Sequence, residues 1–117
     1  MLTLLDLNRA TLARQHLLIR HKGDMAEVVH RLGGLQAQEP RPPYLGIWAR
    51  LEGFARDDLH AALHARTLVR ATMWRATLHL VTAADFAAFR PVLRPVLAPP
   101  RPPTCRPGPA WVASGPS

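Results

Sequence analysis

One stretch of the sequence organises the rest of the chain: Gly33-Gly34-Leu35-Gln36-Ala37-Gln38-Glu39-Pro40-Arg41-Pro42-Pro43. The paired glycines end the segment that precedes them. Three prolines within four positions then forbid a regular helix directly after the glutamines. We therefore predict extended backbone from Leu35 to Glu39.

Two glutamines lie in this extended segment, and side chains two residues apart share a face of an extended chain. Gln36 and Gln38 are predicted to point one way, and Leu35 and Ala37 the other. Two carboxamides directed at one spot can hold a water molecule or a polar ligand. The alternative is a polar loop face that only contacts solvent, as most glutamine side chains do.

Composition indicates a single folded domain with a strong positive charge. The chain has 117 residues, 48% of them hydrophobic, and a net charge of +7 that comes from 14 arginines and a single lysine, Lys22. A length near 100 residues suits one core, and a sequence pI near 11.4 makes nucleic acid the first partner to test. Arginine, alanine and proline are all abundant, so part of the basicity is attributable to coding bias.

Several classes of protein find no support in the sequence. Its one cysteine, Cys105, allows no internal disulfide and has no metal-ligand spacing, which favours a reducing cytoplasm. Residues Met1 to Leu7 have neither a basic n-region nor a sustained apolar segment, and no apolar run is long enough to span a membrane, so we expect a soluble, cytosolic protein. No glycine-rich phosphate loop, Ser-His-Asp order or carboxylate pair is visible, so kinase, esterase and glycosidase functions are not indicated.

Helical spacing of apolar residues predicts five helices. The first is expected from an Asn8 cap to near Gly23, with Ala10, Ala13, Leu17 and Leu18 on its inner face. The others are predicted from an Asp24 and Glu27 capping box to Gly33, from Pro43 to Gly53, from an Asp57 cap through Leu63, and from a Thr82 and Asp85 capping box to Pro95, with Pro91 straining the last.

A β-hairpin is predicted from Leu68 to Val81, because this segment is rich in β-prone residues on either side of Trp74-Arg75-Ala76. Leu78 and Leu80 are expected to face the core, with Thr77, His79 and Val81 on the other face. Arg70 would lie near the first strand and Arg75 at the tip.

Helices followed by an arginine-bearing hairpin give the predicted fold class: mainly α with a small β-hairpin, a winged helix of the helix-turn-helix type. We assign the domain to residues 1–97. Nine of the twelve prolines lie between Pro91 and Pro116, so residues 98–117 are expected to be a proline-rich, irregular tail that is disordered or non-native.

Four side chains are candidates for binding DNA: Arg41, Arg70, Arg75 and His79. The hairpin arginines would contact phosphate and orient the protein, a solvated hairpin edge being the alternative. His79 would be a proton carrier or hydrogen-bond donor at a site, or else a structural histidine.

Two other pairs are not expected to form a site, the first being core residues and the second, His60 and His64, a surface pair. Tyr44 and Trp48 have the spacing of base-stacking residues, but together with Ile47 and Leu51 they favour core packing. His60 and His64 have the i, i+4 spacing of zinc ligands without a third ligand, so no metal site is predicted.

Three blocks resemble the bacterial winged-helix DNA glycosylases that excise alkylated bases and unhook interstrand crosslinks: Leu35-Gln36-Ala37-Gln38-Glu39-Pro40, Tyr44-Leu45-Gly46-Ile47-Trp48-Ala49-Arg50-Leu51 and Arg75-Ala76-Thr77-Leu78-His79-Leu80-Val81-Thr82. The similarity covers about Leu7 to Leu93. Members of that family have tandem winged-helix units and carry a glutamine–apolar–glutamine motif, or glutamine–apolar–aspartate, in the active site. Gln36-Ala37-Gln38 matches the first form.

The resemblance implies hydrolysis of the N-glycosidic bond of N7-alkylated or crosslinked purines in double-stranded DNA. Gln36 and Gln38 would be the catalytic residues and would orient water. No metal or other cofactor is implied. Without a suitably placed lysine, no Schiff base forms and the strand is not cleaved.

The sequence departs from the family pattern in two ways. Ala76 stands where glycine is expected, and the chain is much shorter than family members, so we expect a truncated or frameshifted product. The alternatives are a non-catalytic DNA-binding module, such as a transcription factor domain, and an inactive fragment.

Overall fold

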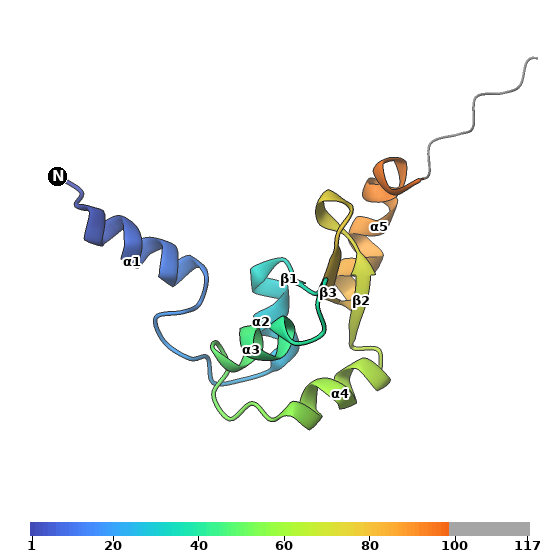
Figure 1. Ribbon diagram of the computed structural model, residues 1–117, viewed down its shortest axis with the longest axis horizontal. Coiled ribbons are helices and arrows are strands. Elements are labelled where there is room, and N and C mark those ends of the chain that lie inside the picture. Colours follow the sequence, from blue (N-terminus) through green and yellow to red (C-terminus); the bar gives the residue numbers. More distant parts are fainter. Residues whose placement is uncertain (99–117) are drawn as a thin grey trace, which may run out of the picture.

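The computed structural model describes residues 1–98 (Figure 1). This part of the chain is mainly α with a small three-stranded antiparallel sheet, which confirms the predicted combination of helices with a small β element. In order, its elements are α1 (Leu4–Arg14), α2 (Met25–Leu32), β1 (Leu35–Gln36), α3 (Pro42–Trp48), α4 (Arg56–His64), β2 (Leu68–Thr72), the 3-10 turn η1 (Trp74–Ala76), β3 (Leu78–Thr82) and α5 (Ala83–Leu97). Apart from Ala98, the predicted proline-rich tail lies outside the described residues.

The sheet has the order β1-β3-β2, so the predicted hairpin supplies two strands and the glutamine segment the third. On β1, Leu35 lies opposite Leu80 of β3, and Gln36 lies opposite His79. Both pairings are antiparallel. Of the extended backbone predicted from Leu35 to Glu39, only Leu35–Gln36 forms an edge strand, and the chain bends from Gln38 onward. The glutamines therefore lie beside the hairpin.

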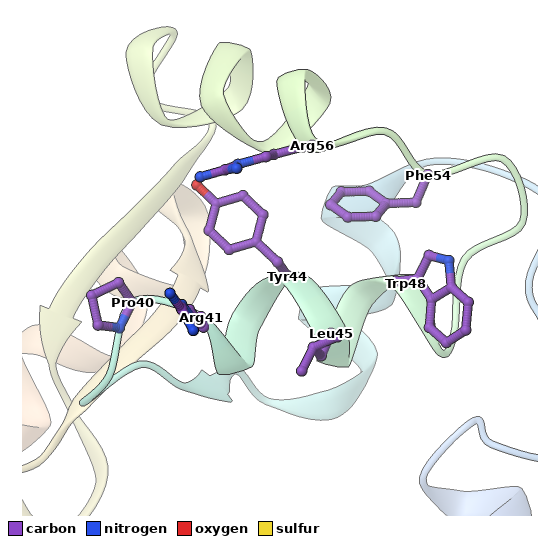
Figure 2. Close-up of a pocket in the computed structure, with 7 residues that line it drawn as sticks. All are labelled: Pro40, Arg41, Tyr44, Leu45, Trp48, Phe54 and Arg56. Atoms are coloured by element: carbon purple, nitrogen blue, oxygen red, sulfur yellow. The ribbon is translucent and has the colours of Figure 1, made fainter.

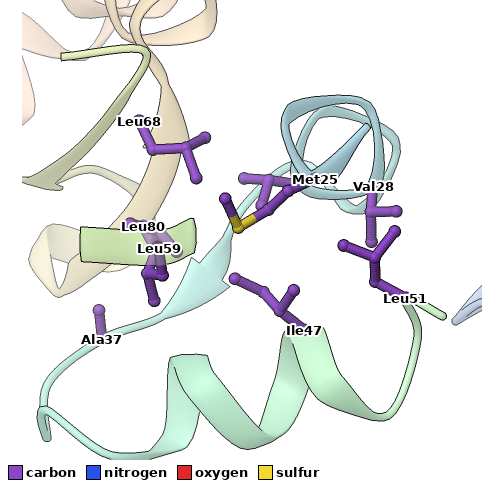
Figure 3. Packing of buried hydrophobic residues seen from close by; sticks show 9 residues of the cluster. Met25, Val28, Ala37, Ile47, Leu51, Leu59, Leu68 and Leu80 are labelled. Carbon is purple, nitrogen blue, oxygen red and sulfur yellow. The ribbon is translucent and has the colours of Figure 1, made fainter. Parts of the chain in front are cut away.

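The core forms where α2, α3 and α4 meet the sheet, around side chains that include Ile47, Leu59 and Leu80 (Figure 3). Burial of each such side chain stabilises the fold by about 1.5–3 kcal/mol. Val81 was predicted to face away from the core, yet only 1% of it is exposed. Adjacent strand residues point to opposite faces, and α5 packs along β2 and β3, so both faces of the sheet are covered.

The predicted position of the first helix is wrong. α1 begins after Thr3, whose hydroxyl accepts a hydrogen bond from the Asp6 amide at 3.2 Å, while the Asp6 carboxylate accepts one from the Thr3 amide at 2.9 Å. This capping box lies upstream of the expected Asn8 cap. The hydrogen bonds from Thr3 lower the pKa of the Asp6 carboxyl. α1 ends at Arg14, buries none of its residues and projects away from the sheet (Figure 1), so the predicted inner face is exposed.

α2 has the predicted bounds, and Gly33 ends it at φ 71° in the left-handed region. Its expected capping box is absent, because Asp24 makes no side-chain capping bond. Glu27 instead contacts Arg31 and His21. The pKa of the Glu27 carboxyl is lowered mainly by the charge of the Arg31 guanidinium and next by the hydrogen bond with His21.

The remaining helices differ from the prediction at their ends. α3 starts at Pro42, one residue early, and in α4 the carboxylate of Asp58, not Asp57, accepts the Ala55 amide at 2.9 Å. α5 continues through Pro91 and Pro95 to Leu97. Both prolines are exposed, so water can satisfy the carbonyls that they leave unpaired. No helix within residues 1–98 is long and apolar enough to cross a membrane.

The hairpin turn places two non-glycine residues in the left-handed region, Arg75 at φ 54° and Ala76 at φ 58°. Left-handed backbone costs an L-residue roughly 1–2 kcal/mol, and glycine avoids that cost. Ala76→Gly is therefore expected to raise the free energy of unfolding by about 1 kcal/mol, measured by urea denaturation. Ala87→Gly is the control on exposed α5 and is expected to lower it by about 1 kcal/mol. An equal loss at both positions would contradict the turn geometry.

Candidate active site

The two glutamines occupy the exposed side of the edge strand β1 and its continuation. Ala37 between them is 1% exposed and belongs to the core, as Leu35 does in part, whereas Gln36 and Gln38 are exposed. The predicted alternation is therefore confirmed. Because Gln36 lies opposite His79 across the antiparallel pair, their side chains are neighbours on one face of the sheet.

Gln38 is tied to the hairpin by its own side chain. Its carboxamide oxygen Oε1 accepts a hydrogen bond from the Leu78 backbone N–H at 3.1 Å, and the neighbouring Ala37 N–H donates to the Leu78 carbonyl at 2.8 Å. The side chain of Gln38 thus extends the β1–β3 ladder by one bond. Within residues 1–98 the Gln36 side chain makes no hydrogen bond, so its carboxamide is available to a ligand.

Arg70 reaches from β2 across β3 to the glutamine segment. Its Nε donates to the Ala37 carbonyl at 2.8 Å and its Nη2 to the Gln38 carbonyl at 3.1 Å. A guanidinium carries five N–H groups in a rigid plane. Two of them are therefore engaged with the backbone that carries Gln38, an arrangement that the sequence did not reveal.

Trp74 holds the beginning of the segment, and the His79 side chain is fixed within the hairpin beside it. His79 Nδ1 lies 2.9 Å from the Thr77 carbonyl, to which only a protonated Nδ1 can donate, so a neutral His79 has Nε2 as its hydrogen-bond acceptor. The indole Nε1 of Trp74 donates to the Gly33 carbonyl at 2.7 Å. The hairpin thus holds the glutamine segment at its beginning and at its end.

The other two predicted DNA contacts lie elsewhere. Arg75 is exposed on the hairpin turn, and Arg41 precedes α3; the side chains of both make no hydrogen bond or ion pair within the described residues. Arg41 lines a surface groove of about 630 Å³ along α3 (Figure 2). The structure therefore brings Arg70 and His79 to the glutamines, whereas the side chains of Arg41 and Arg75 make no hydrogen bond with them within residues 1–98.

The groove is lined by aromatic and basic side chains: Pro40, Arg41, Tyr44, Leu45, Trp48, Phe54 and Arg56 (Figure 2). Core packing was predicted for Trp48, but this residue is 53% exposed, so that prediction is wrong. The Arg20 guanidinium lies 4.2 Å from the centre of the Trp48 ring. Because Arg20 lies far away in the sequence, spacing within α3 could not have indicated this contact.

Two histidines, His60 and His30, make contacts away from the glutamines. His60 packs against the Tyr44 ring with centroids 6.1 Å apart, and residues 1–98 hold no group of three or more His, Cys, Asp or Glu side chains suited to a metal ion. His30 on α2 contacts the Asp85 carboxylate on α5 at 2.9 Å. Asp85 had been predicted to cap α5; its amide does bond the Thr82 hydroxyl at 3.0 Å, but its carboxylate joins the two helices instead.

Comparison with known proteins gives a single positive result. A family model described as DNA glycosylase AlkZ-like matches residues 29–114, which include the glutamine segment, the groove and the hairpin. No curated protein and no solved structure matches. Since the family model covers most of the 117-residue sequence, this chain belongs to the AlkZ-like DNA glycosylase family.

Proposed function

We propose that this protein is a monofunctional DNA glycosylase that hydrolyses the N-glycosidic bond of N7-alkylated or crosslinked purines, acting in the cytoplasm. The observation that carries the proposal is the pair of exposed carboxamides, Gln36 and Gln38, on the edge of a strand that the hairpin holds in place. Membership of a DNA glycosylase family supports DNA as the substrate.

The chemistry suits neutral side chains. An N7-alkylated purine is cationic and leaves as a neutral base, so the protein need not protonate it. Gln36 and Gln38 orient a water molecule toward the anomeric carbon, and their oxygen dipoles stabilise the positive charge that develops on the sugar. Water supplies the new C–O bond, the C–N bond breaks with its electrons on the base, and the released proton passes to solvent.

Strand cleavage through a Schiff base is not part of this proposal. The chain has a single lysine, Lys22. Its ammonium lies 3.7 Å from the Glu52 carboxylate, in the segment that pairs His21 with Leu51 and away from β1. No lysine amine is therefore placed to attack the sugar beside the glutamines.

We also propose that the domain is a winged helix that meets double-stranded DNA with its hairpin. The order α2–β1–α3–α4–β2–β3 and the strand order β1-β3-β2 support this topology. Arg41 and Arg75 would contact phosphate, and His79 and the N–H groups of Arg70 not used within the protein would reach the same DNA. Asp57 and Asp58 are exposed in the first turn of α4, which disfavours insertion of that helix into a groove.

The rival is a DNA-binding module without chemistry, and a base-release assay separates the two. Duplex DNA methylated at guanine N7 is incubated with the protein, and the free base is measured by mass spectrometry beside a no-protein control. We expect time-dependent release of N7-methylguanine. Binding of the same duplex should weaken as salt is added, and a plot of log Kd against the logarithm of the salt concentration should be a straight line. Salt-dependent binding with no base released at any protein dose would favour the rival.

A further inference from the structure

We propose that Arg70 is a positioning residue for Gln38, a role distinct from the DNA contact that its place on the hairpin suggests. This inference rests on the proposed function for its catalytic consequence, but its structural part can be tested without activity. The observation is that one guanidinium holds two consecutive carbonyls of the glutamine segment, those of Ala37 and Gln38.

Three hydrogen bonds hold Gln38 and its backbone, and a fourth, from the Ala37 N–H to the Leu78 carbonyl at 2.8 Å, holds the residue before it. Nε and Nη2 of Arg70 fix the backbone at 2.8 and 3.1 Å, and the Leu78 N–H fixes the carboxamide oxygen at 3.1 Å. β1 itself pairs with β3 only through Leu35 and Gln36. Beyond Gln36 the segment bends toward Pro40, so these bonds replace the regular ladder at the residue that carries the second carboxamide.

The Arg70 contact with Ala37 is partly buried, whereas its contact with Gln38 is exposed. Arg70 lies opposite Leu80 in the register, and both line a small cavity with Ala37, Pro43 and Tyr44. A hydrogen bond from a charged donor is worth more than a neutral one, and more where water is excluded. A planar guanidinium spans two neighbouring carbonyls, which the single ammonium of a lysine does not reproduce.

The kinetic test compares Arg70→Gln with Arg9→Gln, which removes the same charge from the exposed helix α1 without touching the glutamine segment. At saturating methylated duplex, Arg70→Gln is expected to lower the single-turnover rate of base release at least tenfold. Arg9→Gln should leave that rate unchanged. Arg70→Lys keeps the charge and should recover less than half of the rate. A wild-type saturated rate in Arg70→Gln, or full rescue by lysine, would overturn the positioning role.

The structural test uses amide hydrogen exchange of the full chain, with circular dichroism to confirm folding. In Arg70→Gln the Leu78 amide should exchange at least tenfold faster than in wild type, because its acceptor is no longer held. The amides of Val69 and Val81, which lie opposite each other in the β2–β3 ladder, should be unchanged, and Arg9→Gln should match wild type throughout. Unchanged Leu78 protection would refute the inference. If the Leu78 amide exchanges faster in Arg70→Gln but the wild-type protein releases no base, the proposed function is refuted and the positioning of Gln38 by Arg70 is not.

Discussion

A Gln38→Ala protein is expected to release N7-methylguanine at least about 100-fold more slowly than wild type at saturating DNA, while its affinity for the duplex stays close to wild type. Loss of a single group that positions water or stabilises developing charge typically costs a factor of 100 to 1,000, or roughly 3–4 kcal/mol in the barrier. Gln38 carries no charge, and its carboxamide oxygen accepts a hydrogen bond from the Leu78 N–H. The substitution should therefore change the affinity for the duplex very little.

Matched variants make this result interpretable. Gln36→Ala should cause a loss of similar size, and Gln15→Ala, the same change at the exposed end of α1, should have no effect. Gln38→Ala also loses the bond to the Leu78 amide, so it should lower the free energy of unfolding by about 1 kcal/mol, and Gln36→Ala should not. Equal activity in the Gln15, Gln36 and Gln38 variants would remove the glutamines from the mechanism.

Gly34→Ala is expected to lower the free energy of unfolding by about 3 kcal/mol or more, measured by urea denaturation. Gly34 has φ +107°, where alanine is strained, and an added Cβ would lie 2.7 Å from Val81 Cγ1 and 3.1 Å from the Leu80 carbonyl oxygen. Val81 is 1% exposed and cannot move aside without disturbing the core. A loss of this size is a large part of the stability of a typical domain.

The neighbouring glycine provides the control for this second prediction. Gly33 has φ +71°, and a Cβ added there would meet nothing within 4 Å, so Gly33→Ala should cost only about 1 kcal/mol. The difference between the two variants isolates the close approach of the segment to β3. If Gly34→Ala proved no worse than Gly33→Ala, β1 would not pack against the hairpin as described.

Local signals in the sequence predicted those parts of the fold that local physics determines. The glycine end of α2 at Gly33, the turn at Trp74-Arg75-Ala76 and the alternation of Gln36, Ala37 and Gln38 each depend on residues a few positions apart. The predicted start of α1 at Asn8 is wrong because Thr3 and Asp6 form a reciprocal capping box that begins the helix upstream. Both Thr3 and Asn8 are residue types that favour the N-cap position, so residue type alone does not decide where this helix begins.

The site was predictable only in part, because its main contacts join distant residues. Arg70 bonds to Ala37 and Gln38 from 33 and 32 positions away, and Trp74 reaches Gly33 from 41 positions away. No spacing rule connects such positions before the strand order is known. The same holds for Trp48, whose exposure depends on a groove formed with Phe54 and Arg56.

The central claim, that this chain breaks the N-glycosidic bond and leaves the strand whole, is tested most directly on a labelled duplex with one N7-methylguanine. Saturating protein is added, and abasic sites are counted by gel after hot alkali, beside a parallel sample without alkali. The account predicts abasic sites that increase with time at the methylated position, with the strand intact until alkali is added. A duplex that is fully bound yet gains no abasic sites over the no-protein control would contradict it.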